Sequence, residues 1–395
     1  MKIRYYAIFA ILVLLLVGCA VHVEKPLPAL TAVSPREYPL LKDDLDTASL
    51  QQAIGRSLEY YRRLPDNRRY HFGDESYTVR ELRESLMAFR DLMENADSAE
   101  SFERQLYETF DIYRASGKDG RGTVLFTGYY APVLDGSREK TPQYGYPIYR
   151  TPGDHIIIDL TLFDSKYDRE RIVARVVNGR ALPYYTRKNI DVDGHLAGKG
   201  LEIAWLADPV DIFFLHIQGS GIVRLPDGTL LRVSYDQSNG HPYRSIGRFL
   251  VDQGKLSMDE VSLTSIRRYL RSHSDEMFRV LAHNESYVFF RIVEDGPVGC
   301  LDVPVTSGRT IATDSELFPK GAIAFIKTKK PIVDSDGNIT TWEPFSRFVL
   351  NQDTGGAISG PGRVDLYCGL DRYAEIMAGH LKEEGELYFL VKKRK

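Results

Sequence analysis

The spacing of apolar residues along the chain predicts a helical first part. From about residue 43 to residue 116, apolar side chains recur mostly every three to five positions, for example at Leu50, Ile54 and Leu58. The same spacing returns around Leu82 and again after Ser98, a residue type that commonly caps a helix. A glycine-rich run then ends the pattern. We therefore expect a helical part over residues 43–122.

From residue 123 onward the pattern is typical of strands with short helices between them. Asp227-Gly228 stands between two alternating flanks and predicts a hairpin turn. Helices are expected at 170–182, at 245–253, and at 257–274, where Ser257 and Glu260 have the spacing of a capping box. Strands are expected at 124–132, 156–160, 203–218, 222–234, 284–290 and 386–391.

The stretch from residue 303 to residue 369 combines short apolar alternations with turns rich in glycine and proline. This combination is typical of a compact β-barrel. Three aspartates, Asp314, Asp353 and Asp365, stand at or beside the expected strand ends. Acids among such turns and next to apolar strands indicate a catalytic site whose carboxyl pKa values are shifted.

The N-terminus has the features of an export signal. Lys2 and Arg4 precede an apolar run of about a dozen residues, too short for a stable spanning helix. The run ends in Leu16-Val-Gly-Cys19, which resembles a bacterial lipobox, so we expect a signal peptide over 1–18, a lipid on Cys19 and a tether over 19–42. Ala20 after the cysteine favours the periplasmic face of the outer membrane. A plain signal peptide or an anchor helix is the alternative.

Composition and charge exclude several function classes. A formal net charge of −3 offers no basic surface for nucleic acid. The sequence holds no metal-ligand spacing and no phosphate-binding loop, so no metal or cofactor is expected. Cys300 and Cys368 flank the three-aspartate stretch. In an exported protein they are candidates for a disulfide, and two buried free thiols are the alternative.

Five sequence blocks in the same order resemble the membrane-bound lytic murein transglycosylase A family. They are Phe126-Thr-Gly-Tyr-Tyr-Ala-Pro132, the runs 211–221, 239–247 and 284–290, and the three-aspartate stretch. The resemblance implies an α+β fold with a glycan-binding cleft between two domains. It combines a helical N-terminal part (43–122) with a C-terminal double-psi β-barrel (295–395), and a second β-barrel domain (123–294) is inserted between them.

The resemblance also implies an activity. Members of this family cleave the β-1,4 bond between N-acetylmuramic acid and N-acetylglucosamine without water and leave a 1,6-anhydro-muramyl end. The position of the family's catalytic aspartate is Asp365 here, and Asp353 and Asp314 match its two other acids. Peptidoglycan glycan strands are then the substrate, the outer membrane is bound through the lipid, and the cell-wall synthesis machinery is a candidate partner.

Asp365 has to meet the chemical requirements of glycosidic cleavage. Breaking a glycosidic bond requires a carboxyl group that is protonated near neutral pH. In an alternating strand, Val364 and Leu366 lie on the face opposite Asp365, so burial of the acid has to come from elsewhere. Arg363 shares the face of Asp365 and would lower its pKa. Without a second carboxylate to activate water, one acid would act twice, and the muramyl O6 hydroxyl would attack C1.

Several residues are candidates for contacts with the sugar, although ordinary β packing or turn structure explains them equally well. His216 and His241 are expected to be structural, although His216, placed on a strand, would share a face with Phe214 and Gln218. Asp208 and Asp211 are expected in a turn and cap. The candidate sugar-binding residues are Thr127, Tyr129, Tyr130, Gln218, Gly219, Ser220, Gly355 and Gly356.

Three other functions compete with this one. Asp353-Thr-Gly355 resembles the Asp-Thr-Gly of aspartic proteases, but only one such triplet is present. A peptidoglycan hydrolase would use Asp365 and Asp353 as a pair of acids. A lipoprotein without activity would bind peptidoglycan only.

Overall fold

A computed structural model describes residues 28–168 and 170–394. The expected signal peptide, Cys19 and the first part of the expected tether lie outside the described residues. The later part of that tether belongs to the folded domain, because strand β1 (Leu30–Ala32) pairs with strand β4 (Phe110–Ala115) and Leu30 is buried. The short helix η1 (Pro35–Glu37) follows β1.

Among the described residues, six strands close into a barrel. Their order around the ring is β19, β16, β17, β15, β18 and β5, and β5 pairs again with β19. Two pairs are parallel, β15 with β17 and β18 with β5, and β4 and β1 extend the sheet from β19. The bounds are β5 Val124–Tyr129, β15 Thr310–Ala312, β16 Ile323–Val333, β17 Ile339–Asp353, β18 Arg363–Tyr367 and β19 Lys382–Lys392.

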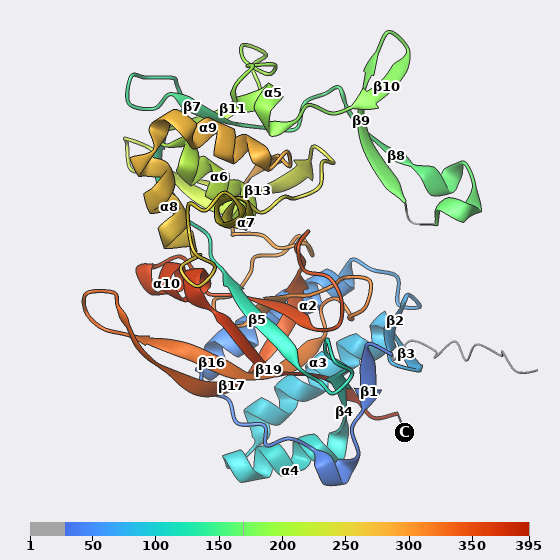
Figure 1. The fold of residues 1–395 in the computed structure, drawn as a ribbon. Helices are drawn as coiled ribbons and strands as arrows, with labels where there is room; N and C mark the ends of the chain where they lie inside the picture. Colours follow the sequence, from blue (N-terminus) through green and yellow to red (C-terminus); the bar gives the residue numbers. More distant parts are fainter. Residues whose placement is uncertain (1–27, 169, 395) are drawn as a thin grey trace, which may run out of the picture.

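Helices of the N-terminal part pack on this barrel and share its core (Figure 1). They are α2 (Thr47–Arg62), α3 (Val79–Asn95) and α4 (Ala99–Thr109), and a small hairpin of β2 (Arg69–Phe72) and β3 (Glu75–Thr78) separates the first two. The helical prediction is confirmed, and Ser98 caps α4. The last helix is shorter than predicted, because Phe110 and Tyr113 lie on β4, where both side chains are buried in the barrel core.

The inserted part forms a second lobe around a curled six-stranded sheet, counted over the described residues. The strand order is β14, β13, β12, β6, β11 and β7, and the two end strands are in contact. The strands are β6 Val133–Ser137, β7 Tyr146–Tyr149, β11 Glu202–Leu206, β12 Ser220–Arg224, β13 Leu230–Ser238 and β14 Val288–Val293. The helices are α5 Arg187–Asp191, α6 Pro209–Gln218, α7 Ile246–Asp252, α8 Leu263–Ser272 and α9 Ser274–His283. The predicted hairpin at Asp227-Gly228 and the helix at 245–253 are confirmed.

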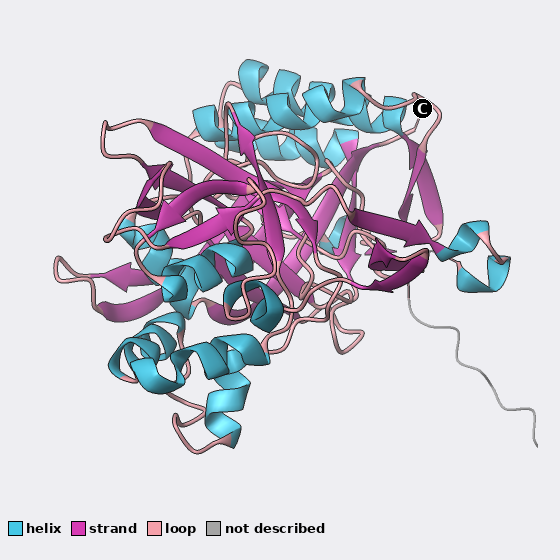
Figure 2. Ribbon diagram, turned by 90° about the horizontal axis from the view of Figure 1, so that it is seen from above, coloured by secondary structure: helices cyan, strands magenta, loops and turns pink. Residues whose placement is uncertain are grey.

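A separate three-stranded sheet projects from this lobe (Figures 1 and 2). It consists of β8 (His155–Asp159), β9 (Arg171–Val177) and β10 (Arg180–Pro183), with the short helices η2 (Leu160–Leu162) and η3 (Ser165–Tyr167) at its end. The helix expected at 170–182 is therefore wrong. Asn178 and Gly179 both have positive φ, 51° and 75°, and form the tight turn of a hairpin, which such a pair favours.

Two further predictions are corrected. The strand predicted at 203–218 ends at Leu206, and residues 209–218 form helix α6. Asp208 caps α6, Pro209 opens it, and Gly219 ends it with a φ of 76°. Most of α6 is buried, so its apolar run lacks the one-sided pattern that identifies a helix. The helix expected from Ser257 begins instead at Leu263, because Ser262 is the cap.

The two lobes meet beside helix α10 (Arg372–His380) of the barrel domain, which packs against β5 and contacts α8 of the inserted lobe (Figure 1). The close fit of α10 depends on Gly128, because a Cβ there would lie 2.9 Å from the Cα of Ala378. Strand β5 leads from the barrel into the inserted lobe, so the residues just after it connect the two lobes.

Candidate active site

Asp365 lies in the middle of β18, between β15 and β5. It is in register with Ala312 on one side and with Thr127 on the other. Val364 and Leu366 are buried in the barrel core, so the side chain of Asp365 is on the opposite face, as the alternation predicts. The hydroxyl of Thr127 donates a hydrogen bond to the Asp365 carboxylate.

The pKa of Asp365 is raised from 3.8 to about 6, and burial is the main cause. Arg363 opposes this shift, and the charge of Asp353 adds to it. The guanidinium of Arg363 donates to the hydroxyl oxygen of Thr127 at 3.3 Å, so Thr127 stands between the arginine and the acid. Burial therefore outweighs the arginine, and a substantial fraction of Asp365 is protonated near pH 6.

Asp353, at the end of β17, has both carboxylate oxygens occupied. One oxygen accepts the N–H groups of Cys300 and Thr354, each at 2.9 Å. The other accepts the hydroxyl of Tyr129 at 2.8 Å. Burial raises the pKa of Asp353, and the bond from Tyr129 opposes that shift. A carboxylate held in this way is poorly placed to bind and activate a water molecule.

The third acid of the stretch is bound to the backbone of a loop. Asp314 accepts the N–H of Glu316 at 3.0 Å and the N–H of Gly360 at 2.7 Å. These bonds connect the chain after β15 to the loop that leads into β18. Asp314 therefore shapes the loop next to the strand of Asp365, and the hydrogen bonds of its carboxylate do not join it to Asp365.

Thr127 and Tyr129 lie side by side on β5, and both contact an acid of the site. Tyr130, the next residue, is buried, and its hydroxyl is bonded to Glu375 at 3.1 Å and to Arg267 at 2.9 Å. Its N–H donates to the side-chain oxygen of Gln218 at 2.9 Å. Of the three residues of this block, the structure brings Thr127 and Tyr129 to Asp365 and Asp353, and it places Tyr130 in the joint between the lobes.

The glycines and serine of the candidate set differ in their surroundings. Gly219 ends α6 in a left-handed conformation, and Ser220 is buried at the start of β12. Gly355 packs close to Ile358. Gly356 is exposed with open space around its Cα, and no acceptor among the described residues takes its N–H. The N–H of Gly355 likewise has no acceptor among the described residues, so both glycines carry a backbone donor that is free for a ligand, and Gly356 is the more exposed of the two.

The structural roles expected for the two histidines agree with their contacts. His216 is buried in α6 against Tyr287, and its Nδ1 lies 2.9 Å from Arg187. Burial and then Arg187 hold its pKa well below the usual value. Its placement on a strand face toward the cleft was wrong. His241 bonds the carbonyl oxygen of Tyr184 at 2.8 Å.

Of the two alternatives for Cys300 and Cys368, the structure has the free thiols rather than the disulfide, with Cys300 exposed and Cys368 half-buried. The sulfur of Cys300 is turned to the carbonyl of Gln352, 3.7 Å away, and that of Cys368 to the carbonyl of Leu366, 3.4 Å away. Over residues 28–168 and 170–394, no cluster of side chains is suited to hold a metal ion. Within the same residues, no helix is both long and apolar enough to span a bilayer.

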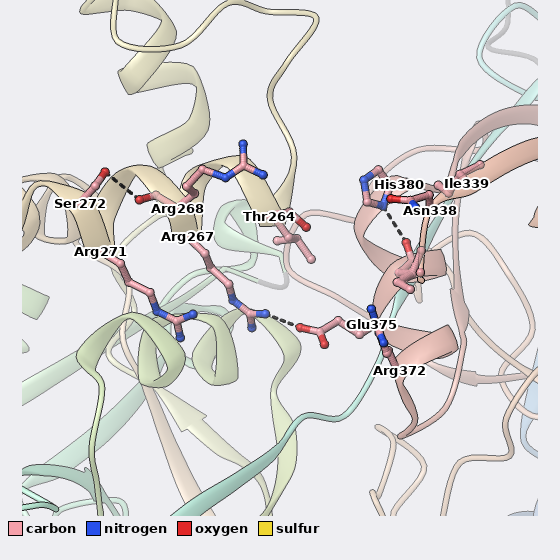
Figure 3. A pocket seen from close by; sticks show the side chains of 13 residues that line it. Thr264, Arg267, Arg268, Arg271, Ser272, Asn338, Ile339, Arg372, Glu375 and His380 are labelled. Atoms are coloured by element: carbon pink, nitrogen blue, oxygen red, sulfur yellow. Dashed lines mark hydrogen bonds and ion pairs between the residues drawn. The ribbon is translucent and has the colours of Figure 1, made fainter. Parts of the chain in front are cut away.

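A groove of about 950 Å³ lies on the outer side of the joint, between α8 and α10. In Figure 3, Arg267 reaches across it to Glu375. Arg268 and Arg372 also line the groove. The sequence patterns did not identify these arginines, because the groove forms only where α8 meets α10, two helices that are distant along the chain. Arg267 and Glu375, for example, are 108 positions apart.

Residues 125–291 match the family described as MltA specific insert domain, and residues 309–391 match the 3D domain. The chain is 31% identical over 283 residues to membrane-bound lytic murein transglycosylase A of Escherichia coli K12, with 71% of this chain and 69% of the relative covered. The chain belongs to this family. The Vibrio cholerae relative of the same name is 30% identical and covers 69% of this chain, which spans 67% of that relative.

Solved structures of the family share the fold. The membrane-bound lytic murein transglycosylase of Agrobacterium tumefaciens superposes with a TM-score of 0.75 at 32% identity, covering 92% of this chain and 98% of the other. MltA of Neisseria gonorrhoeae has a TM-score of 0.64 at 31% identity, covering 84% and 96%. Escherichia coli MltA with bound chitohexaose has a TM-score of 0.71 at 23% identity, covering 94% and 95%, which supports the fold. The predicted fold class and the family resemblance are confirmed.

Proposed function

We propose that this chain is a peptidoglycan lytic transglycosylase in which Asp365 acts first as acid and then as base. It cleaves the β-1,4 bond between N-acetylmuramic acid and N-acetylglucosamine and leaves 1,6-anhydro-muramyl ends. The observation that carries the proposal is the half-buried Asp365 carboxyl, whose pKa is raised to about 6 beside a single hydroxyl donor. The proposal agrees with the names of the family members.

The first step moves a proton from the Asp365 carboxyl to the glycosidic oxygen. The bond between C1 and that oxygen breaks, and positive charge develops at C1 and the ring oxygen. The Asp365 carboxylate that remains is stabilised by the hydroxyl of Thr127 and by the charge of Arg363. In the second step this carboxylate takes the proton of the muramyl O6 hydroxyl, and O6 bonds to C1. Asp365 returns to its protonated form, and no water is consumed.

The occupancy of Asp353 disfavours a two-acid hydrolase. Its two oxygens already accept three hydrogen bonds, which leaves little room for a water molecule to bind them, whereas an O6 hydroxyl held next to C1 needs no such base at Asp353. We assign Asp353 and Asp314 supporting roles, in which Asp353 adds negative charge near Asp365 and Asp314 shapes the loop. Proteolysis through Asp353 is disfavoured for the same reason, since its carboxylate oxygens are bonded to backbone N–H groups and a tyrosine.

For the glycan itself we propose contacts on both lobes. Tyr129 and the N–H of Gly356 lie on the barrel side, and residues 218–220 at the end of α6 lie on the other. Gln218 holds the backbone of Tyr130, so movement of the inserted lobe would move this contact with it. Domain limits of 43–122, 123–294 and 295–395 remain a proposal. Strand β5 is shared, since it belongs to the barrel sheet and leads into the inserted lobe.

We also propose that Cys19 carries a lipid that holds the enzyme at the periplasmic face of the outer membrane. The relatives' names describe membrane-bound proteins, which agrees with an anchor. The test is fractionation of cells that express the full chain or its Cys19→Ser variant. The full chain is expected in outer-membrane fractions, and the variant is expected to leave them. A variant that stays in the outer membrane contradicts the proposal.

The activity is tested by digesting purified peptidoglycan sacculi and identifying the soluble products by mass spectrometry. Products with 1,6-anhydro-muramyl ends support the proposal, and reducing muramic ends identify a hydrolase. Released peptides without cut glycan identify a protease. If nothing is released while the protein co-sediments with sacculi, the chain is a binding protein only.

A further inference from the structure

The sheet of β8, β9 and β10, with η2 and η3 at its end, is called the arm. Cross-strand pairs gather apolar residues on one face of the arm, whereas the other face mixes apolar pairs such as Ile157 with Val173 and charged pairs such as Asp159 with Arg171. One face carries the pairs Ile156 with Ala174, Ile158 with Ile172, and Val176 with Ala181. All of these side chains are apolar, yet Ile172 and Val176 are 48% and 55% exposed. The face is therefore open at Ile172 and Val176, although Ala174 between them is buried.

The end of the arm is more exposed still. Leu162 at the end of η2 is 86% exposed, and Phe163 next to it is 75% exposed. No other large apolar side chain in the described part of the chain reaches either value. Two neighbouring apolar side chains at the tip of a projecting arm, continuous with an apolar sheet face, mark an interaction surface.

Two ion pairs lie near the tip, and Glu170 beside them is exposed. Asp159 lies 3.4 Å from Arg171, and Asp164 lies 3.5 Å from Lys166. The ammonium group of Lys166 also lies over the ring of Tyr167, at 4.8 Å. These pairs present no strong charge of either sign next to Leu162, which suits the interface of a largely zwitterionic bilayer better than a highly charged partner.

The start of the described chain lies on the side of the molecule toward which the arm projects (Figures 1 and 2). Leu30 follows Cys19 by eleven positions, so this segment spans at most about 40 Å. A lipid on Cys19, as proposed above, would therefore keep the arm near a bilayer surface. Because the lipid would hold the arm close to the bilayer, the effective concentration of membrane surface at the arm is high. A small apolar area inserted from the arm is then enough for lasting contact.

We propose that the arm rests on the membrane that holds the lipidated Cys19, with Leu162 and Phe163 inserted at the level between headgroups and acyl chains. The lipid supplies the anchor, and the arm supplies the orientation. Two attachment points fix the orientation of the inserted lobe. The proposed glycan-binding cleft between the lobes then faces away from the membrane. This proposal rests on the proposed lipid anchor.

The test uses the full lipidated chain in vesicles of phosphatidylethanolamine and phosphatidylcholine that contain brominated phosphatidylcholine. Phe163→Trp is compared with Met258→Trp, a matched control in the loop between α7 and α8 whose native side chain is 53% exposed. The fluorescence of the unsubstituted chain, with its two native tryptophans, is subtracted. We expect blue-shifted emission and strong bromine quenching for the Phe163→Trp variant and little quenching for the Met258→Trp variant.

The outcomes separate the two proposals. If the chain floats with the vesicles but the Phe163→Trp variant is quenched no more than the Met258→Trp variant, the arm proposal is wrong and the anchor stands. If the chain does not float at all, both are wrong. If sedimentation of the chain in detergent shows a dimer that Leu162→Asp with Phe163→Asp dissociates, the arm binds a second copy, which also overturns the proposal.

Discussion

Replacing Asp365 by asparagine should stabilise the protein at neutral pH while it removes activity. Between pH 3.8 and about 6, the folded state keeps a proton on Asp365 that the unfolded state has lost. Stability therefore falls as pH rises through this window, and the loss remains at neutral pH. The full pKa change corresponds to about 3 kcal/mol, which is an upper limit because Asp365 is partly exposed, so the expected effect is about 1–3 kcal/mol.

The amide introduced by Asp365→Asn keeps an oxygen that accepts the Thr127 hydroxyl but carries no charge, so the penalty for a buried charge disappears. The free energy of unfolding is measured by urea denaturation at pH 4 and at pH 7.5, on wild type and on Asp365→Asn. We expect the variant to be more stable by about 1–3 kcal/mol at pH 7.5 and nearly equal at pH 4. Digestion of sacculi by the variant should fall to background, while its binding to sacculi is kept.

Asp44→Asn is the matched control with the opposite sign. Ion pairs with Arg347 and Lys330 outweigh burial and lower the pKa of Asp44, so its removal should destabilise the protein most at neutral pH. If Asp365→Asn destabilises the protein at pH 7.5 as Asp44→Asn does, the carboxylate of Asp365 is favoured by the fold. The assignment of Asp365 as the acid is then refuted.

Three further predictions concern the same site. The kcat/KM on glycan strands should fall about tenfold per pH unit above pH 6, because catalysis begins from protonated Asp365; a flat profile from pH 5 to pH 8 would argue against that. Thr127→Val removes the hydrogen-bond donor to Asp365 and should shift the pH at which kcat/KM begins to fall upward by about one unit. An unchanged pH dependence would show that this bond has no effect on the pKa of Asp365. Tyr129→Phe removes one donor of Asp353 and should lower stability by about 1–3 kcal/mol in urea denaturation, and a neutral effect would show that the bond is dispensable.

Local patterns were sufficient for several strands of the barrel and for the side of β18 on which Asp365 lies. The alternation of Val364 and Leu366 places Asp365 on the opposite face, and the structure agrees. The same kind of reasoning failed at 209–218, where a helix buried on nearly all sides has no polar face that would distinguish it from a strand.

The surroundings of the acids could not be predicted, because they depend on contacts between distant segments. Thr127 meets Asp365 only because β5 pairs in parallel with β18, 238 positions later in the chain. The balance between burial and Arg363, which decides the pKa of Asp365, likewise follows from this pairing. Sequence spacing identifies the residue, and the closure of the barrel determines its chemistry.

The fate of water in the reaction tests the central claim most directly. Defined glycan strands are digested in water enriched in heavy oxygen, and the muramyl ends are examined by mass spectrometry. The single-acid mechanism predicts 1,6-anhydro ends, lighter by one water molecule than hydrolysed ends and free of heavy oxygen. Reducing muramic ends that carry heavy oxygen at C1 would show that water is the nucleophile and would contradict the mechanism.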